Sequence, residues 1–393
     1  MKQTLLIHIG WHKTATSLIQ LYLDRHRESL KEYDICYPFI DDRSGCSEIK
    51  HSYLYLSVIN KLKLAHMQHD LKVLDFDDLF ALSVKEIVDS GCRWAIISEE
   101  GLSQATPGIS KLMGRYKDYF DDIKIVAYVR RQDYFLESLY SQFVKQKPFR
   151  SLLYLDEYIQ LPMVRKSADY DLILDWWADE FGKENVLVAP FESRTIMPDP
   201  LTYFFNFTGL PASVLEKLPV EQKEVHVTPP REVTEFFRHM NLNHSVFFDE
   251  VLIEYLMKSG AALTNTKYFC RADREKILQE YESSNKKVAR KYLNRDDGIL
   301  FEEPIEDFSN CPETWKGLQP LEVLNYALPV TGMMSDEIAR LRYEISGLKS
   351  KNSMLNIENM ELRNENQRIA NVKKTIYRFL QKSYREMARN YRT

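Results

Sequence analysis

Five short apolar runs, separated by segments of helical pattern, constrain the fold of this chain more than any other feature of the sequence. Strands that alternate with helices are typical of βαβ units, in which crossover helices cover both faces of a parallel sheet. The sequence therefore predicts an α/β fold around a parallel sheet over residues 1–211. The predicted strands span residues 4–9, 35–38, 94–98, 123–129 and 186–190.

The composition is that of a folded protein of the cytoplasm. Of the 393 residues, 44% are hydrophobic and 28% are charged, which excludes a disordered chain. No apolar run approaches the roughly 20 residues that a membrane-spanning helix needs. The five cysteines are scattered without CxxC spacing, which predicts reduced thiols and no metal site. Outside the basic last residues the chain is acidic, so no nucleic-acid partner is expected.

Beyond residue 211 the pattern changes three times. Residues 212–304 predict a helical C-terminal lobe of the same domain, and the proline-containing residues 305–334 predict a linker. Residues 335–376 carry heptad repeats, which predict a parallel coiled coil and a homodimer. Asparagine at the a position of a heptad favours two parallel helices in register. The alternative is a single helix packed on the body. The d positions are Leu341, Leu348, Leu355, Leu362, Ile369 and Ile376, and the a positions are Ile338, Ile345, Asn352, Asn359, Asn366 and Lys373.

The last residues, 377–393, form a basic amphipathic tail. Apolar side chains share one face of the predicted helix, and cations surround them. This pattern is typical of a segment that lies on an anionic membrane surface, which would place the cytoplasmic protein at the inner face of the membrane. The other interpretation is a solvated helix end, which is what charge runs usually form.

The first predicted strand leads into a polar turn that a helix follows. Free N–H groups at a helix N-terminus, together with a cation and hydroxyl groups, make a cradle for phosphate. The turn is no Walker A loop, because Lys13 follows Gly10 by only three residues and the second glycine is missing. A polar turn without a ligand is the alternative. The residues of the predicted cradle are His12, Lys13, Thr14, Ala15, Thr16 and Ser17.

A second anion site is predicted where the fourth strand ends. Arg130 follows that strand, at the sheet edge where open α/β sheets place ligands. Ser138 lies eight residues further on, about two helical turns away, and returns toward the same space. Taken alone, Arg130 would be interpreted as a surface charge that pairs with Asp133 or Glu137.

Together the two segments resemble the sulfotransferase superfamily, and more closely bacterial sulfotransferase-like proteins that use 3′-phosphoadenosine 5′-phosphosulfate (PAPS). Residues 8–16, HIGWHKTAT, are similar to the phosphosulfate loop HIGxHKTGT of that family, and residues 129–140 are similar to its 3′-phosphate motif. Residues 186–193, 207–211 and 281–301 resemble later segments of the bacterial members. The resemblance covers roughly residues 1–304 and implies a P-loop-like three-layer fold.

The resemblance also implies roles for individual residues. His12 to Ser17 would hold the 5′-phosphosulfate, with Lys13 at the bridging oxygen, and Arg130 and Ser138 would hold the 3′-phosphate. No metal ion is required. Ala15 departs from the family, which usually has glycine there: it strains the loop if the position needs a positive φ, and is harmless if the position needs only a small side chain. We favour the second interpretation.

The general base is predicted at one of two places. Glu99 and Glu100 follow the third strand, where the superfamily often keeps a base, and His51 follows the second strand. The structural alternatives are helix capping for the two acids and a surface position for the histidine. The sequence does not decide whether His51 or the Glu99/Glu100 pair is the general base.

The resemblance therefore implies a PAPS-dependent sulfotransferase that moves a sulfuryl group to an acceptor hydroxyl by direct in-line transfer. By analogy with the family, the acceptor is a glycan or a polysaccharide precursor. Two other functions stay open. One is a P-loop kinase, although no acidic metal-holding motif accompanies the loop. The other is a catalytically inactive nucleotide-binding scaffold that acts through its coiled coil.

Overall fold

The computed structural model describes most of the chain, and the widest gaps between its described ranges lie in the C-terminal part. The described residues are 3–40, 49–64, 75–145, 149–196, 198–219, 229–241, 256, 267–305, 313–351, 366–376 and 378. The chain divides into two compact units. The sheet unit comprises Met1–Ser138, Ile159–His226 and Arg271–Ser309, and the second unit comprises Leu139–Tyr158, Val227–Cys270 and Asn310–Thr393.

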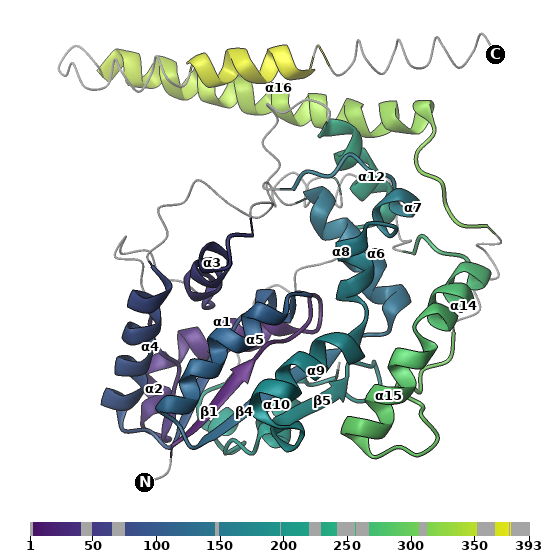
Figure 1. The fold of residues 1–393 in the computed structure, drawn as a ribbon. Coiled ribbons are helices and arrows are strands. Elements are labelled where there is room, and N and C mark those ends of the chain that lie inside the picture. The colour runs from purple at the N-terminus through teal and green to yellow at the C-terminus, as the bar shows by residue number, and fades with distance from the viewer. Residues whose placement is uncertain are drawn as a thin grey trace. The chain divides into compact units, whose positions relative to one another are not determined.

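A sheet of five parallel strands forms the centre of the sheet unit, as the apolar runs predict (Figure 1). Its order is β2-β3-β1-β4-β5, so β1 lies in the middle with β3 and β4 on its two sides. Both neighbours therefore end next to the turn that leaves β1. The strands are β1 (Thr4–His8), β2 (Ile35–Cys36), β3 (Trp94–Ser98), β4 (Asp122–Val129) and β5 (Val186–Pro190).

The helices of this unit begin and end at residues whose chemistry suits those positions. The side chains of Asp75, Asp169 and Asp199 accept hydrogen bonds from backbone N–H groups in the first turns of α4, α9 and α10. Gly91 and Gly209 end α4 and α10 in the left-handed conformation. The helices are α1 (Thr16–Arg25), α2 (Arg27–Lys31), α3 (Ser52–Lys61), α4 (Phe76–Ser90), α5 (Pro107–Met113), α6 (Gln132–Lys145), α8 (Pro162–Ser167), α9 (Tyr170–Phe181), α10 (Pro200–Thr208), α11 (Val214–Lys217), α14 (Arg271–Glu280) and α15 (Glu282–Leu293).

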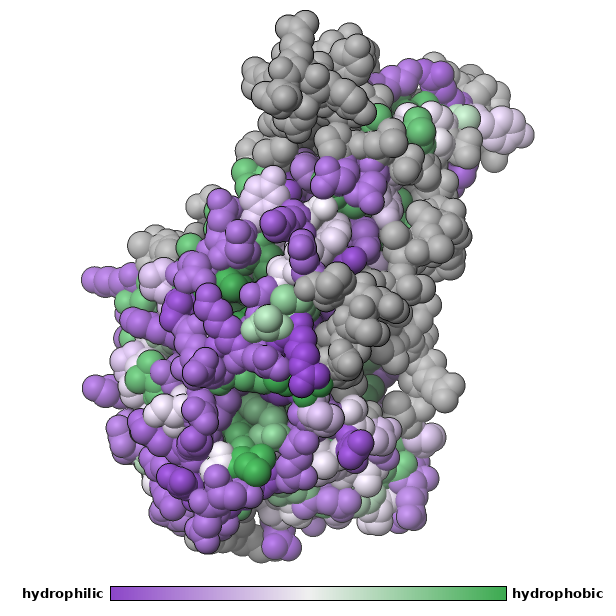
Figure 2. All heavy atoms as spheres, turned by 90° about the vertical axis from the view of Figure 1, so that its right-hand side faces the viewer, coloured by the Kyte–Doolittle hydropathy of each residue, from purple (hydrophilic) through white to green (hydrophobic). Residues whose placement is uncertain are grey.

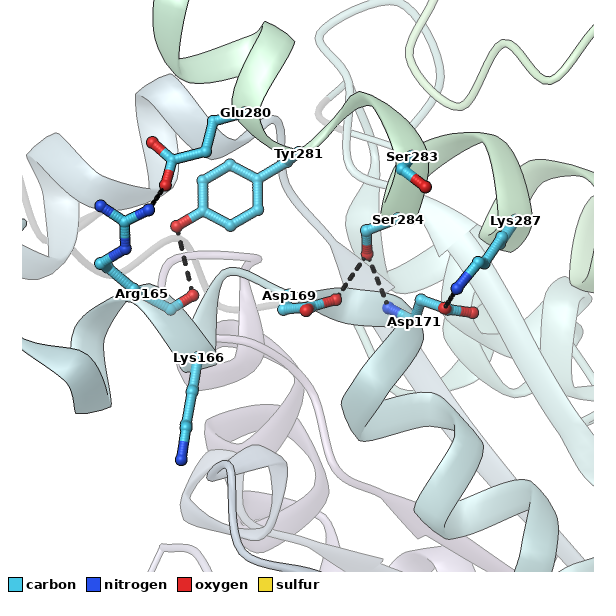
Figure 3. A pocket seen from close by; sticks show the side chains of 9 residues that line it. All are labelled: Arg165, Lys166, Asp169, Asp171, Glu280, Tyr281, Ser283, Ser284 and Lys287. Atoms are coloured by element: carbon cyan, nitrogen blue, oxygen red, sulfur yellow. Dashed lines mark hydrogen bonds and ion pairs between the residues drawn. The ribbon is translucent and has the colours of Figure 1, made fainter.

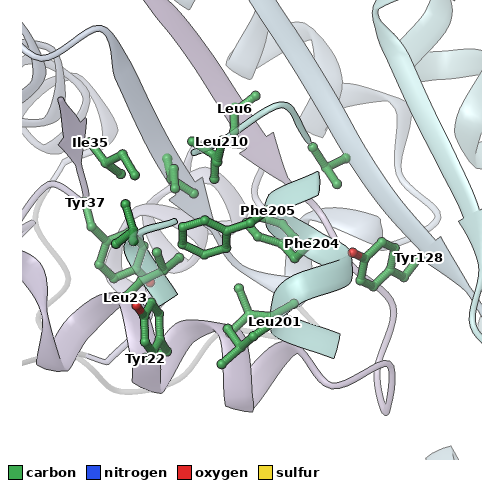
Figure 4. Close-up of a cluster of buried hydrophobic side chains, with 14 of the residues drawn as sticks. Leu6, Tyr22, Leu23, Ile35, Tyr37, Tyr128, Leu201, Phe204, Phe205 and Leu210 are labelled. Carbon is green, nitrogen blue, oxygen red and sulfur yellow. The ribbon is translucent and has the colours of Figure 1, made fainter. Parts of the chain in front are cut away.

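One cluster of buried side chains fixes α1 against the sheet (Figure 4). Leu23 of α1 and Phe204 and Phe205 of α10 are fully buried, and they pack with Leu6 of β1. Burying side chains of this size stabilises a fold by roughly 1.5–3 kcal/mol each. The cluster therefore holds the N-terminus of α1 at the end of β1.

The second unit differs from what the sequence predicted. Residues 305–334 are not a linker throughout, because helix α16 (Pro320–Lys351) begins inside them. Val323, Tyr326, Ala327 and Val330 recur at helical spacing and are buried. The predicted C-terminal lobe is also divided, since residues 271–304 belong to the sheet unit and Val227–Cys270 to the second unit. The other helices of the second unit are α7 (Leu155–Tyr158) and α12 (Arg231–Met240).

Hydrophilic side chains predominate on the face that Figure 2 shows, where apolar side chains form small separate patches. Among the described helices, none is long and apolar enough to cross a membrane. The predicted basic tail, residues 377–393, lies outside the described residues apart from Arg378, and so does the stretch 352–365 of the heptads.

Candidate functional site

The turn after β1 is a tight loop with three residues in the left-handed region. Gly10, Lys13 and Ala15 have φ angles of 36°, 67° and 61°. A Cβ at Gly10 would lie 2.5 Å from Cγ2 of Thr16 and 3.3 Å from Nε2 of His8, so only glycine fits there. The loop therefore passes directly over the end of β1 before α1 begins at Thr16.

Ala15 requires a correction. We expected this position to need only a small side chain, but its φ of 61° lies where glycine is favoured. A residue with a Cβ costs about 1 kcal/mol or more in this conformation. The alanine therefore strains the loop at the residue that immediately precedes α1.

Internal contacts hold the loop in shape. The hydroxyl of Thr14, fully buried, donates to the carbonyl of Trp11 at 2.6 Å and accepts from the N–H of the same residue at 3.3 Å. The indole N–H of Trp11 donates to the carbonyl of Ser167, and its ring meets the edge of Tyr170 at 5.0 Å between centroids. The loop is thus tied to the junction of α8 and α9.

Lys13 and Arg130 bring two positive charges to one place. A guanidinium N–H of Arg130 donates to the backbone carbonyl of Lys13 at 3.1 Å, and the hydroxyl of Tyr170 donates to the carbonyl of Arg130. Burial, followed by the charge of Arg130, lowers the pKa of Lys13. Burial also lowers the pKa of Arg130. An anion bound between these side chains would relieve both effects.

The two predicted anion sites therefore meet at the carboxyl ends of the neighbouring strands β1 and β4. Ser138, the other predicted member of the second site, is buried in α6. Within the described residues the structure shows no hydrogen bond that joins it to Arg130. Of the remaining loop residues, Thr16 is buried in the first turn of α1 and Ser17 is exposed beside it.

Glu100 borders the loop on its other side. Its Oε1 atom lies 3.9 Å from Nδ1 of His12 and 3.1 Å from Nζ of Lys50, and its Oε2 atom accepts from the amide of Gln20 at 3.2 Å. Burial alone would raise the pKa of Glu100, but the charges of Lys50 and His12 lower it to about 2. Burial lowers the pKa of His12. The site thus pairs an ionised carboxylate with an imidazole next to Lys13.

Glu99 has a structural position, as the capping alternative describes. One carboxylate oxygen accepts from the N–H of Gly101 at 3.0 Å and from Lys50 at 3.2 Å, and the other accepts from the hydroxyl of Ser52 at 2.9 Å. Burial and the charge of Glu100 raise its pKa. With these donors around it, Glu99 supports the turn after β3 and holds Lys50 against Glu100.

His51 is buried, with both ring nitrogens engaged. Nδ1 accepts from the N–H of Ser98 at 2.9 Å, and Nε2 lies 2.9 Å from the carbonyl of Pro38, to which it donates. Burial lowers the pKa of His51 to about 4. The imidazole therefore connects β3 to the segment after β2, and its hydrogen bonds to the backbone leave neither nitrogen available to take a proton from a substrate.

Sequence reasoning missed Gln20 and Lys50. Gln20 is buried on α1, one turn beyond Thr16, and donates to the hydroxyl of Ser98 as well as to Glu100. The signal for Gln20 was its position, because an amide four residues after Thr16 lies on the same face of α1. Lys50 precedes His51 in sequence, but no pattern in the chain indicated that it would bridge two carboxylates.

A separate polar cavity of about 370 Å³ lies among α8, α9 and α15 (Figure 3). None of the predicted site residues lines it. Its charged side chains largely pair with one another, Arg165 with Glu280 and Lys287 with Asp171. Among the residues that the structure describes, no group of three or more His, Cys, Asp or Glu side chains could hold a metal ion.

Comparisons with known proteins give only distant likenesses. No family model matches the chain. An uncharacterized protein of Archaeoglobus fulgidus is 29% identical over 216 residues, which are 52% of this chain and 54% of that protein, so the match spans about half its length. Among solved structures, the crystal structure of a sulfotransferase from Alicyclobacillus acidocaldarius is similar, at 20% identity and a TM-score of 0.36. That match covers 65% of this chain and all of the other.

Proposed function

We propose that this protein is a PAPS-dependent sulfotransferase whose nucleotide site is the loop after β1 together with Arg130. The observation that carries the proposal is the meeting of Lys13 and Arg130 at the ends of two neighbouring strands. Two half-buried cations, of which Arg130 lowers the pKa of Lys13, fit a ligand with several anionic groups, and PAPS carries a phosphosulfate and a 3′-phosphate. The resemblance of residues 8–16 and 129–140 to the family's motifs supports the same assignment.

In the proposed reaction, an acceptor oxygen attacks the sulfur atom in line with the bond to the bridging oxygen. That bond breaks as the new one forms, and the nucleotide leaves with the electron pair. Charge spreads over the sulfuryl oxygens, so catalysis depends on positioning and on electrostatic stabilisation, as in phosphoryl transfer. Lys13 supplies positive charge at the departing oxygen, and the backbone N–H groups at the start of α1 face the anion.

We assign the removal of the acceptor proton to His12 and Glu100. Because burial lowers its pKa, His12 is neutral near pH 7 and able to take a proton. The ionised Glu100, 3.9 Å from Nδ1, then stabilises the imidazolium that forms. Lys50 and Gln20 hold that carboxylate in position. The acceptor that we propose, a glycan hydroxyl, rests on family analogy alone.

Calorimetric titration with the stable product nucleotide, 3′-phosphoadenosine 5′-phosphate, tests this function without knowledge of the acceptor. We expect it to bind more tightly than ATP, and the Arg130→Ala variant to bind it about ten to a hundred times more weakly, because hydrogen bonds to charged groups contribute roughly 1.5–3 kcal/mol. Lys166→Ala, which removes an exposed cation beside the separate cavity, is the matched control and should bind as the native protein does.

Equal binding of ATP and the 3′-phosphorylated nucleotide would contradict the sulfotransferase assignment and favour a kinase. Tight binding without transfer to any acceptor in a glycan screen would instead favour the inactive scaffold. A native affinity in Arg130→Ala would remove Arg130 from the site.

A further inference from the structure

The N-terminal part of α16 packs on α12 within the second unit and is not a free stalk. The rings of Tyr326 in α16 and Phe236 in α12 lie 5.7 Å apart between centroids. Val323, Ala327 and Val330 are buried on the same helix. One face of α16 is therefore already occupied before the predicted heptads begin.

Further along α16, a later segment of the same chain packs against the heptad positions Ile338 and Leu341. Residues 366–376 are helical, and Ile369 in this segment is only 8% exposed because Ile338 and Leu341 of α16 pack against it. Figure 1 shows this segment, in yellow, lying beside α16. Ile369 and Leu341 are d positions and Ile338 is an a position, so one part of the predicted heptads pairs with another part of the same chain's heptads.

The exposure of the returning segment agrees with this pairing. Ile369 and Thr375 are buried, whereas Asn366 and Lys373, which are heptad a positions, are exposed. A parallel two-stranded coiled coil would cover both a and d positions and would bury these polar groups at a cost in stability. Pairing within the chain leaves them in water and still buries the isoleucine.

We infer that the heptad region closes on itself as an intrachain helical hairpin, in which residues 366–376 are the partner of the Ile338–Leu341 face of α16. Tethering favours this arrangement, because a segment of the same chain meets its partner at an effective concentration on the order of millimolar. A second copy of the chain would have to reach a comparable concentration to displace residues 366–376 from α16. Because the same side chains cannot pair twice, a dimer through this face requires the hairpin to open.

Disulfide trapping in the full-length chain tests the hairpin. Ile338→Cys combined with Ile369→Cys should form a disulfide on mild oxidation, and the product should migrate as a single chain on a non-reducing gel. Mass spectrometry of the linked tryptic peptides separates this bond from any that involves a native cysteine. Ile338→Cys with Arg368→Cys is the matched control, because Arg368 is exposed on the same segment and should not link.

Leu341→Cys alone tests the competing arrangement, since a parallel dimer places this d position opposite its own copy. We expect it to remain a single chain. A disulfide-linked Leu341→Cys dimer, a 338–369 bond that joins two chains, or no 338–369 bond would each overturn the hairpin. Sedimentation of the unmodified chain gives a second measurement that needs no substitution. A single-chain mass at all concentrations agrees with the hairpin, and a mass that doubles with concentration together with a Leu341→Cys disulfide contradicts it.

Discussion

Ala15 shows how one backbone angle decides the effect of a methyl group. The loop leaves β1, turns over Gly10 and enters α1 through a residue with a φ of 61°. From the sequence, Ala15 could either strain the loop or be harmless. The sequence did not decide between the two, because φ at this position depends on the whole loop. Contacts from Thr14 and Trp11 fix the loop, and position 15 follows from them.

Replacing Ala15 with glycine should therefore stabilise the protein by about 1 kcal/mol, since glycine tolerates a positive φ without a steric cost. Urea denaturation measures the change in the free energy of unfolding. Ala81→Gly is the matched control, because Ala81 is exposed inside α4 and the same exchange there should destabilise by roughly 0.5–1 kcal/mol. Equal losses in both variants would mean that position 15 carries no strain.

The other residues of the proposed site divide according to how local their contacts are. Lys13 and Arg130 were predicted from the sequence, because the end of a strand and the start of a helix are local features that a parallel sheet brings to one edge. Gln20 and Lys50 act through contacts that only the folded chain creates. His51 was predicted as a candidate base from its position after a strand, but hydrogen bonds to distant backbone groups use both of its nitrogens.

At the scale of elements, the strands were the easiest part to predict. Central strands of a parallel sheet are buried on both faces, so they appear as continuous apolar runs, and the predicted runs match β1 to β5 to within two residues at each end. Helix α16 was missed at its N-terminal end, because prolines in residues 305–334 suggested a linker. The helical spacing of Val323, Tyr326, Ala327 and Val330 was the signal that those prolines obscured.

A buried charge network joins α6 to α14. Arg274, fully buried, donates to Asp133 at 2.8 Å and to Glu137 at 2.6 Å, and Arg131 forms two further hydrogen bonds with Asp133. Arg131 also donates to the carbonyl of Glu303. Breaking such a buried pair is far costlier than losing an exposed one, because the partner is left as an uncompensated charge.

We therefore expect Arg274→Met to lower the free energy of unfolding by about 3–5 kcal/mol, since two buried carboxylates lose their shared cation. Arg271→Met, on the same helix, removes an exposed i,i+4 pair with Glu275 and should change it by less than about 0.5 kcal/mol. Thermal and urea denaturation of both variants measure the contrast. Similar small losses in the two would show that the network does not contribute to stability.

At the scale of the whole molecule, segments distant in sequence complete the sheet unit. Residues 271–309 belong with the strands, and Glu192 accepts hydrogen bonds from the N–H groups of Glu302 and Glu303. Such long-range pairings carry no local signature, which explains why residues 212–304 were predicted as one lobe although Val227–Cys270 belong to the second unit. The buried histidines belong to the same unit, and their protonation affects its stability as a whole.

The contribution of His51 to stability should decrease as the pH falls from about 6.5 toward 4. The pKa of His51 is about 4 in the folded protein and 6.5 in the unfolded chain, so the unfolded state binds the proton first in this window. Each pH unit then costs about 1.4 kcal/mol for a fully titrating group. His8, whose pKa burial also lowers to about 4, adds a term of the same sign, whereas the raised pKa of Glu99 acts in the opposite direction.

The contributions of the histidines and of Glu99 oppose one another, so the pH dependence of the native protein's free energy of unfolding is a poor test by itself. The difference between the native protein and a His51 variant is a good one. Between pH 7 and pH 5, the free energy of unfolding of the native protein should fall by about 2 kcal/mol more than that of His51→Gln, which has no imidazole to protonate. Glu100 leaves this comparison unaffected, because both proteins contain it and its contribution cancels in the difference. Urea denaturation at pH 7, 6 and 5 measures the difference, and parallel slopes would mean that His51 does not stay neutral in the folded protein.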